Sequence, residues 1–468
     1  MTIDNNKLPE DALLEIFDAY RQLYELQPHY ENVWNSRDGW FKLAHVCLRW
    51  RRVVLLSSSR LHVHLLFTPR RSSREPVLRW LPHFPILVDY SAASWTEKEE
   101  NLALAAIGHR SRVHRIALRR PCPCMAKLLK ALSHPFPELE SLEIRFTCDR
   151  HSELILPATF LSGSAPSLRR LTLQEVVPEC LSPLLSSTTG LVELDLTLRV
   201  AYGALPEASF IANLQRMSCL RRLELKVTHR DINITPNSPP PPASAGDVVP
   251  LLKLTDLIFI GYGPYLQMLV VSLAAPSLQH LDAEVWESTI SPIPHLCRFI
   301  CDTECQFIAV RLDFSRRKLR FSAQTCSKPG HAQPFRIIIP DTFTLEEIGN
   351  MLSGPLSTVE GLVVGWDAPL SNLQPYIQWR GFFNHIRQVK TVQVPSVVAL
   401  GVAHSLQLNG QEPALDFLPT LEQVTVHMTY LSPIESNRND QYVSIRDAFE
   451  PLIAARKQVG RPIRLLWT

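Results

Sequence analysis

Leu168-Arg169-Arg170-Leu171-Thr172-Leu173 is the clearest copy of a short phrase that recurs through most of this chain. The phrase has leucine at its first, fourth and sixth positions, and its last three residues alternate between apolar and polar. This alternation is typical of a strand with one buried face. Pro166 lies two residues before the phrase and favours a turn there, because residues next to proline resist continuing a helix. The phrase therefore predicts a short strand that is entered from a turn.

Six other copies are similarly strong, and three further copies are weaker. The strong copies begin at Val113, Leu139, Leu168, Leu191, Leu220, Leu254 and Leu278, and the weaker ones at Val359, Val389 and Leu421. The strong copies begin between 23 and 34 positions apart. This period is that of leucine-rich repeats, in which each unit supplies a strand and returns through a helix or a turn. We therefore predict an α/β fold with an irregular leucine-rich-repeat solenoid over residues 111–468, because each unit buries its apolar face only by stacking on its neighbours.

Two stretches interrupt this period. From about residue 290, the segments Phe307–Leu312, Leu319–Phe321 and Phe335–Ile339 alternate like strands but lie too close together for helical returns. We predict hairpins or bare turns between them. Residues 235–246 are rich in proline and are expected to form an extended, exposed loop. Alternatively, that loop is a ligand for a domain that binds proline-rich peptides.

The N-terminal residues show a second pattern, which predicts two amphipathic helices. Pro9 suits the first turn of a helix, and Glu10 and Asp11 place negative charge at the positive end of its dipole. The apolar residues of this helix share one stripe and are Leu13, Ile16, Phe17 and Tyr20. A second helix repeats the spacing from Leu43 to Val54. Two stripes in so short a segment cover each other only partly, so apolar surface remains for the rest of the chain or for a partner.

The order of these residues resembles an F-box, the module that docks a protein onto the Skp adaptor of a cullin ubiquitin ligase. An F-box typically opens with Leu-Pro-x-Glu, continues with Leu-x-x-Ile-Phe and closes with Val-Cys-x-x-Trp-Arg. The matching residues are Leu8, Pro9, Glu10, Leu13, Ile16, Phe17, Val46, Cys47, Trp50 and Arg51. The stretch from Pro69 to Val88 resembles the segment that follows the F-box in proteins of mushroom-type (basidiomycete) fungi. Residues 21–39 depart from the family, because they are longer than its usual connection and are predicted to form an inserted loop.

The resemblance divides the chain into an F-box-like helical domain (1–60), a linker with a first strand or cap (61–110) and the repeat solenoid (111–468). It implies a non-catalytic substrate receptor that binds the Skp adaptor, and through it a cullin, with its N-terminal helices. The repeats would hold an unknown client protein, and other subunits would supply catalysis by proximity. The adaptor-binding positions that it implies are Leu8, Pro9, Leu13, Ile16, Phe17, Val46, Cys47 and Trp50.

Some of those eight positions must form the core of the F-box rather than the contact. The alternative function is a leucine-rich-repeat scaffold with no role in ubiquitination, whose N-terminal helices bind the adaptor or merely cap the solenoid. Exposure of Leu8, Pro9 and Ile16 would favour docking, whereas their burial against the first repeats would favour a cap.

Composition argues against several other classes of function. The chain has 48 Lys and Arg against 45 Asp and Glu, so its net charge of +3 implies no general attraction to nucleic acid or membranes. Eight arginines and one acid lie between Arg49 and Arg79, but few aromatic residues stand among them, which disfavours base stacking. No apolar run is long enough to span a membrane, and the first residues are not a secretion signal. We expect a cytoplasmic or nuclear protein that is not secreted.

No catalytic motif is visible. The sequence has no phosphate-binding glycine loop, no zinc-protease motif and no serine-hydrolase motif, so we expect neither an enzyme nor a cofactor. An enzyme with a site hidden between repeats is the third alternative. Cys297, Cys301 and Cys305 recur every four residues and could line one face of a helix. A structural zinc site usually has paired cysteines and a fourth ligand, so we expect ordinary thiols.

Overall fold

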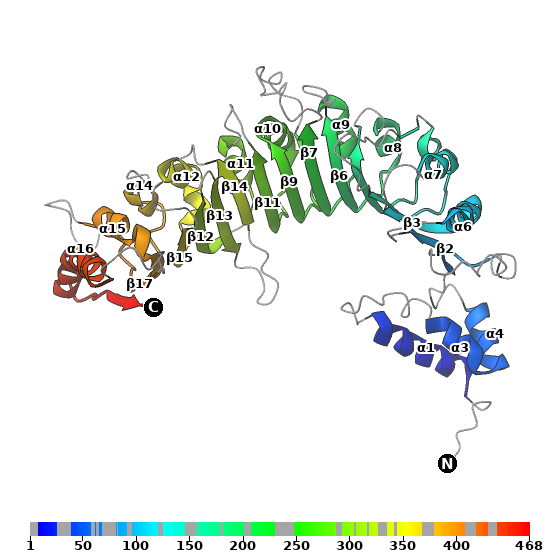
Figure 1. Ribbon diagram of the computed structural model, residues 1–468, viewed down its shortest axis with the longest axis horizontal. Helices are drawn as coiled ribbons and strands as arrows, with labels where there is room; N and C mark the ends of the chain where they lie inside the picture. The colour runs from blue at the N-terminus through cyan, green and yellow to red at the C-terminus, as the bar shows by residue number, and fades with distance from the viewer. Residues whose placement is uncertain are drawn as a thin grey trace, which may run out of the picture. The chain divides into compact units, whose positions relative to one another are not determined.

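The computed structural model of the chain is a mixed α/β protein whose strands are mainly parallel (Figure 1). It divides into two compact units, Met1–Leu191 and Val192–Thr468. The residues that the structure describes are 8–25, 39–57, 61, 65–67, 81, 83–90, 96–119, 125–145, 156–157, 159–177, 181–200, 207–229, 248–286, 293–303, 306–315, 318–325, 335–340, 344–366, 379–407, 418–428 and 438–468.

Three helices lie near the start of the first unit and contact one another. They are α1 (Glu10–Glu25), α3 (Gly39–Val46) and α4 (Leu48–Leu56). The sequence predicts one helix from Leu43 to Val54, and this is wrong, because Cys47 has an extended backbone (φ −159°, ψ 171°). The Cys47 Sγ caps α4 by accepting a hydrogen bond from the Trp50 N–H at 3.4 Å. The predicted loop also begins too early, at residue 21, because α1 continues to Glu25.

The first unit then forms parallel strands in the spatial order β1-β2-β3-β4-β5. Their bounds are β1 (Leu65–Phe67), β2 (Ile86–Tyr90), β3 (Val113–Arg119), β4 (Ser141–Arg145) and β5 (Arg170–Val176). The helical segments of this part are α6 (Glu97–Gly108), η2 (Arg110–Arg112), α7 (Met125–Ala131), η4 (Phe160–Gly163) and α8 (Ser182–Ser187). A capping box fixes the start of α6, since Thr96 Oγ1 accepts the Glu99 N–H and the Glu99 carboxylate accepts the Thr96 N–H.

The second unit has the strand order β6-β7-β9-β11-β14-β13-β12-β15-β16-β17-β18. The strands in chain order are β6 (Glu193–Val200), β7 (Arg222–His229), β9 (Asp256–Tyr262), β11 (His280–Trp286), β12 (Phe307–Ser315), β13 (Lys318–Thr325), β14 (Phe335–Pro340), β15 (Gly361–Trp366), β16 (Thr391–Pro395), β17 (Gln423–His427) and β18 (Arg464–Trp467). Two short strands, β8 (Val249–Pro250) and β10 (Leu273–Ala274), pair separately.

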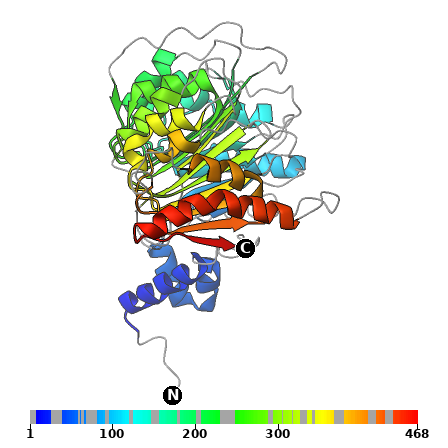
Figure 2. The same ribbon diagram turned by 90° about the vertical axis from the view of Figure 1, so that its left-hand side faces the viewer.

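The helices of the second unit lie along one side of these strands, as Figures 1 and 2 show. They are α9 (Glu207–Gln215), α10 (Gly263–Ser272), α11 (Ile293–Cys301), α12 (Leu345–Met351), α13 (Ser353–Leu356), α14 (Trp379–Phe383), α15 (Ser396–Ser405) and α16 (Arg438–Gln458). The side chains that alternate away from these helices form the strand face of this unit.

The predicted hairpins of the irregular region are confirmed. β13 runs antiparallel to both β12 and β14, whereas β12 and β14 run parallel to their outer neighbours β15 and β11. The chain therefore enters this region at β12, returns through β13 to β14 beside β11, and then crosses to β15. The three strands stand in the sheet in the reverse of their sequence order.

Every phrase of the recurring pattern lies at a strand, as predicted. All but the first of these strands begin two residues after the phrase starts. The fourth phrase positions of consecutive copies are aligned in register, as at Leu194, Leu223, Leu257 and Leu281, which are all fully buried. The core is thus built from ladders of aliphatic side chains, one from each strand. The proline-rich stretch 235–246 lies outside the described residues.

Candidate functional site

The three N-terminal helices sort the predicted adaptor-binding positions into two groups. Leu13 and Phe17 are buried among the helices, at 0% and 1% exposure. Pro9 is exposed, as are Ile16 at 44% and Val46 at 52%. The partly buried positions are Leu8, Cys47 and Trp50. Only part of the predicted set is therefore accessible to a partner.

Side chains of α4 hold the start of α1 and the end of α3 in place. The Arg49 guanidinium donates a hydrogen bond to the backbone oxygen of Leu8. Arg51 Nε donates to the backbone oxygen of Ala44 at 2.9 Å. The ring of Trp50 meets the buried ring of Phe17 edge to face, with centroids 5.0 Å apart. Arginines that the sequence places between apolar positions thus fix the geometry of this group.

The same helices expose two more apolar side chains that the sequence prediction missed. Leu48 is 78% exposed and Leu56 is 72% exposed. Both lie on α4, whose buried residues are Val53 and Val54. Helical spacing does not mark Leu56 as exposed, since it lies three residues after the buried Val53. Exposed apolar surface of this kind is typical of a protein contact when it is contiguous.

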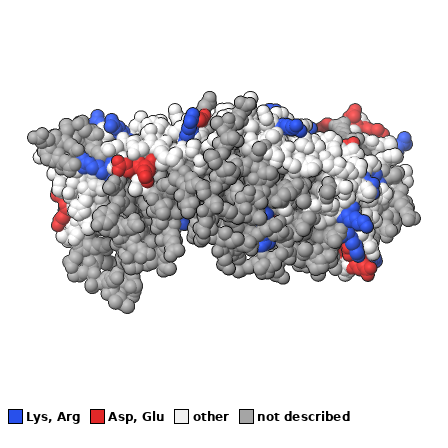
Figure 3. Space-filling view, turned by 90° about the horizontal axis from the view of Figure 1, so that it is seen from above, with Lys and Arg blue, Asp and Glu red and all other residues white. Residues whose placement is uncertain are grey.

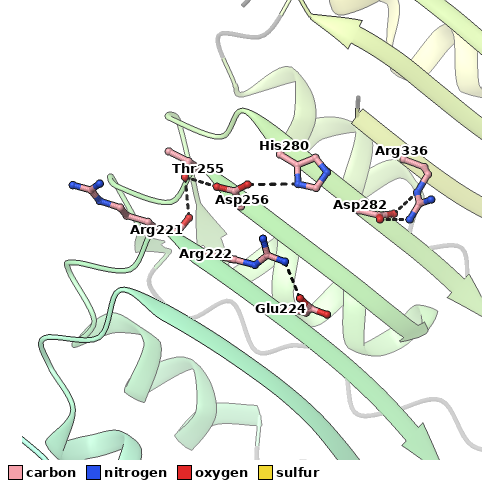
Figure 4. Close-up of polar contacts among 8 residues, drawn as sticks. All are labelled: Arg221, Arg222, Glu224, Thr255, Asp256, His280, Asp282 and Arg336. Carbon is pink, nitrogen blue, oxygen red and sulfur yellow. Dashed lines mark hydrogen bonds and ion pairs between the residues drawn. The ribbon is translucent and has the colours of Figure 1, made fainter. Parts of the chain in front are cut away.

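The strand face of the second unit begins with a row of ionisable side chains (Figure 4). The register places Arg222 of β7 beside Asp256 of β9, and Asp256 beside His280 of β11. Two residues further along β11, Asp282 pairs in register with Arg336 of β14. Four strands that are distant in sequence thus bring their charged side chains together.

Two ion pairs lie along β7. Glu224 accepts a hydrogen bond from Arg222 at 3.0 Å and lies 2.8 Å from the Lys226 ammonium. Burial raises the pKa of Glu224. Its contacts with Lys226 and Arg222 lower that pKa by a larger amount, so the resulting pKa lies below the ordinary value of a glutamate. Glu224 therefore remains ionised at neutral pH.

His280 is one of the least exposed groups of this row. Its side chain is 16% exposed, and its Nδ1 lies 3.6 Å from Asp256 Oδ1. Burial, together with the charges of Arg222 and Arg336, lowers the pKa of His280 by more than the charges of Asp256 and Asp282 raise it. Thr255 Oγ1 donates to Asp256 Oδ2 at 2.6 Å and contacts the Arg221 backbone oxygen at 3.1 Å. Asp256 is thus held by Thr255 on one side and faces His280 on the other.

The hairpin region completes this face. Arg336 Nε donates to Asp282 Oδ1 at 2.7 Å, and a second guanidinium nitrogen contacts Oδ2. Lys318 of β13 pairs with Glu284 of β11 at 2.8 Å. Beyond these pairs, Tyr262 and Trp286 meet edge to face at the ends of β9 and β11, at 5.7 Å. The face therefore passes from ionic contacts to an aromatic pair along the strands.

A second cluster lies in the first unit, on the positions of β3 and β4 that alternate with the buried Ile116, Leu118, Leu142 and Ile144. These positions belong to the strand face of the first unit. Glu143 of β4 is surrounded by Arg119, Arg145 and Arg115, at 2.7, 2.6 and 4.0 Å respectively. Burial raises the pKa of Glu143, but the hydrogen bond from Arg119 and the charges of the arginines outweigh it and leave the pKa low. The same hydrogen bond raises the pKa of Arg119, against the effect of its burial. One ionised carboxylate here faces three guanidinium groups.

The cysteine pattern does not build a metal site in the described part of the chain. α11 ends at Cys301, Cys297 is buried while Cys301 is exposed, and Cys305 lies outside the described residues. Burial raises the pKa of the Cys297 thiol to about 12 and also raises that of Cys301, so both remain thiols at neutral pH. Over the described ranges, no group of three or more His, Cys, Asp and Glu side chains is arranged to hold a metal ion.

Lys and Arg side chains and Asp and Glu side chains are scattered in small groups over the face drawn in Figure 3. No helix in the described ranges combines the length and the apolar character needed to cross a bilayer. The clusters on the two strand faces consist of paired ions on strands, an arrangement suited to binding a charged partner surface.

No protein-family model matches this chain, and no curated protein shows significant similarity to it.

Proposed function

We propose that this chain is the non-catalytic substrate receptor of a SKP–cullin–F-box ubiquitin ligase. Its N-terminal helices would dock on the Skp adaptor, and its strand faces, as parts of a leucine-rich-repeat solenoid, would hold a client protein. The observation that supports this best is the exposure of Ile16 and Val46, two apolar residues at positions that match the F-box pattern.

The packing of the three helices explains why these residues suit a partner. Leu13 and Phe17 already fill the core between the helices, so that core closes without burying Ile16 and Val46. Because each side chain is about half exposed, burying the remainder in a complex is favourable by about 0.7–1.5 kcal/mol each. Leu48 and Leu56 on α4 would extend the apolar surface.

In this proposal, the rest of the chain needs only to bind the client protein. A receptor of this class holds its client near the enzyme that carries ubiquitin, and the reaction gains from proximity. The charged rows and the aromatic pair on the strand faces offer specific contacts to a protein surface. In this proposal no residue of the chain takes part in bond chemistry.

The test is co-purification of the full chain with the Skp adaptor, comparing the parent with an Ile16→Glu, Val46→Glu double variant. We expect the parent to retain the adaptor and the variant to lose it, because two carboxylates would be buried without partners in the contact. Circular dichroism should show that the variant keeps its helices, since both positions are on the surface.

Leu400→Glu is the matched control. Leu400 is 40% exposed and also lies on a helix, α15, so the same chemical change occurs at similar exposure in the other unit. This variant should retain the adaptor like the parent. If a well-folded parent fails to bind the adaptor, the ligase role is wrong, and a leucine-rich-repeat scaffold with an N-terminal cap remains.

A further inference from the structure

We propose that Cys219 and Lys253 form a modification site, at which hydrogen peroxide joins the cysteine sulfur to the lysine nitrogen through a reversible S–N bond. Such a bond is a sulfenamide, and it is called the Cys219–Lys253 link below. The inference goes beyond the proposed function and does not depend on adaptor docking.

The repeat places these two residues at the same position of consecutive copies. Leu220 and Leu254 begin two of the strong copies, and Cys219 and Lys253 directly precede them. The N–H of each leucine donates to the carbonyl three residues earlier, in both cases at 3.0 Å. Each hydrogen bond closes a turn, so Cys219 and Lys253 are the third residues of two equivalent turns.

The backbone holds these two turns side by side. Two residues after Cys219, the Arg221 oxygen accepts the N–H groups of Thr255 and Asp256, at 2.9 and 3.0 Å. The same alignment places Cys219 next to Lys253, at the spacing of neighbouring strands, which is about 4.8 Å. Lys253 Nζ accordingly donates a hydrogen bond to Cys219 Sγ at 3.9 Å. The thiol and the amine therefore meet without a rearrangement of the backbone.

Both side chains are accessible to a small oxidant. The leucines that follow them are buried, Leu220 at 1% and Leu254 at 0% exposure, whereas Lys253 is exposed and Cys219 is half-buried. Peroxide can thus reach the sulfur from solvent. The flexible four-carbon stem of a lysine allows its nitrogen to close the remaining distance to the sulfur.

The pairing of a thiol with an amine is specific to these two copies. Ser167, Gly190 and Ser277 occupy the same position in the neighbouring strong copies. The repeat itself therefore does not require cysteine or lysine there. Oxidation of a cysteine is favoured by exposure and by a nearby cation, and the contact with Lys253 supplies both conditions at Cys219.

The other thiols of the second unit that the structure describes are less suited to this reaction. Cys297 is buried, and burial raises the pKa of its thiol to about 12. Cys301 contacts the Met351 backbone oxygen at 3.5 Å, and burial and the charge of Asp302 raise the pKa of its thiol. Because the thiolate is the reactive form, both should react with peroxide more slowly than Cys219.

The reaction has two steps. The Cys219 sulfur first attacks one oxygen of hydrogen peroxide, the O–O bond breaks, and the products are a sulfenic acid and water. The unprotonated Lys253 amine then attacks the sulfur, the S–O bond breaks, and the hydroxyl group leaves with a proton from nitrogen as a second water. Overall, the sulfur loses two electrons to one peroxide, and a thiol, an amine and hydrogen peroxide give a sulfenamide and two waters.

The test is mass spectrometry of the full chain after treatment with hydrogen peroxide and digestion without reductant. We expect a linked pair of peptides that contain Cys219 and Lys253, lighter than the sum of the two free peptides by two hydrogens. Dithiothreitol added after oxidation should restore both free peptides, because a thiol attacks the sulfur and releases the amine.

Lys253→Arg is the decisive variant. It keeps a positive charge near the sulfur, but a guanidinium does not lose its proton and so does not attack the sulfenic acid. We expect the link to disappear and the labelling of Cys219 by dimedone, which traps sulfenic acids, to rise several-fold over the parent. Cys219→Ser should lose both the link and the label.

Two matched controls should form the link as the parent does. Lys226→Arg makes the same change on β7, where Lys226 lies 2.8 Å from the Glu224 carboxylate rather than beside the thiol. Cys301→Ser removes an exposed thiol from the same unit. Circular dichroism establishes that each variant is folded.

Three results would overturn the proposal. Cys219 could remain a thiol under conditions that oxidise free cysteine, or it could be oxidised in the parent without a bond to Lys253. The folded Lys253→Arg protein could also give the same loss of two hydrogens at Cys219, which would assign the nitrogen to another group. Because no adaptor is present in this assay, its outcome is independent of co-purification with the Skp adaptor.

Discussion

At the scale of single residues, His280 should make the stability of the protein depend on pH. Burial keeps its folded-state pKa below the ordinary value of about 6.5, so the unfolded chain binds the proton more readily. Stability from this residue is therefore present above about pH 6.5 and is lost as the pH falls through the folded-state pKa. We expect the urea midpoint of the parent to fall more between pH 7.5 and pH 5.5 than that of His280→Gln, in solutions of equal salt.

His109 and His385 also have pKa values that burial lowers, so part of the pH dependence should remain in the His280→Gln variant. A double variant, His280→Gln with His385→Gln, should lose a further part. If the parent and His280→Gln lost equal stability on acidification, His280 would have the same pKa in both states, contrary to the burial argument.

The F-box-like residues show where sequence reasoning stops at this scale. The apolar stripe of α1 correctly predicts a helix. Ile16 and Phe17 are neighbours on that stripe but differ in burial. Phe17 is buried against Trp50, whereas Ile16 is exposed. Helical spacing alone cannot separate them, because only the positions of α3 and α4 decide which edge of the stripe is covered.

At the scale of elements, Arg456 should be essential for attaching α16 to the rest of its unit. It is fully buried, and its guanidinium donates to the backbone oxygens of Leu418 and Pro419. Leu418 has φ +46°, and its oxygen also accepts the Leu421 N–H at 3.1 Å. Arg456→Met should lower the free energy of unfolding by about 2–4 kcal/mol, measured by urea denaturation, since two hydrogen bonds from a buried guanidinium would be lost.

Arg461 supplies the control for this prediction. It donates to the same Pro419 oxygen at 3.3 Å but is exposed, so Arg461→Gln should cost much less. Equal losses in the two variants would show that burial of Arg456 is not what holds the helix.

The strands and their phrases could be predicted at this scale, but their neighbours could not. Alternation marked β12, β13 and β14 as strands joined by tight turns. The pattern is the same for parallel and antiparallel strands, so it did not show that β14 would stand beside β11 and β12 beside β15. In the sequence, the ion pairs of β7 are visible as opposite charges two residues apart. The pair between Asp282 and Arg336 is not visible in the sequence, because it depends on the reversed order of β12, β13 and β14 in the sheet.

At the scale of the whole molecule, the adaptor contact and the Cys219–Lys253 link should differ in their sensitivity to a thiol reductant. The adaptor contact rests on apolar side chains such as Ile16 and Val46, whose burial needs no oxidised sulfur. The link rests on a covalent bond to sulfur, which a thiolate breaks by attacking that sulfur. In excess dithiothreitol, adaptor binding by the parent should therefore persist, whereas the oxidised protein should lose its link.

Reciprocal variants complete this prediction, because they separate two independent sites from one shared site. The Ile16→Glu, Val46→Glu protein should still form the link with peroxide, and the Cys219→Ser protein should still co-purify with the Skp adaptor. Mass spectrometry of the digest and adaptor co-purification provide the measurements. The two sites lie in different compact units, Met1–Leu191 and Val192–Thr468, so neither change should reach the other site. If either change removed both properties from a folded protein, the sites would not be independent, and a single site would have to account for both.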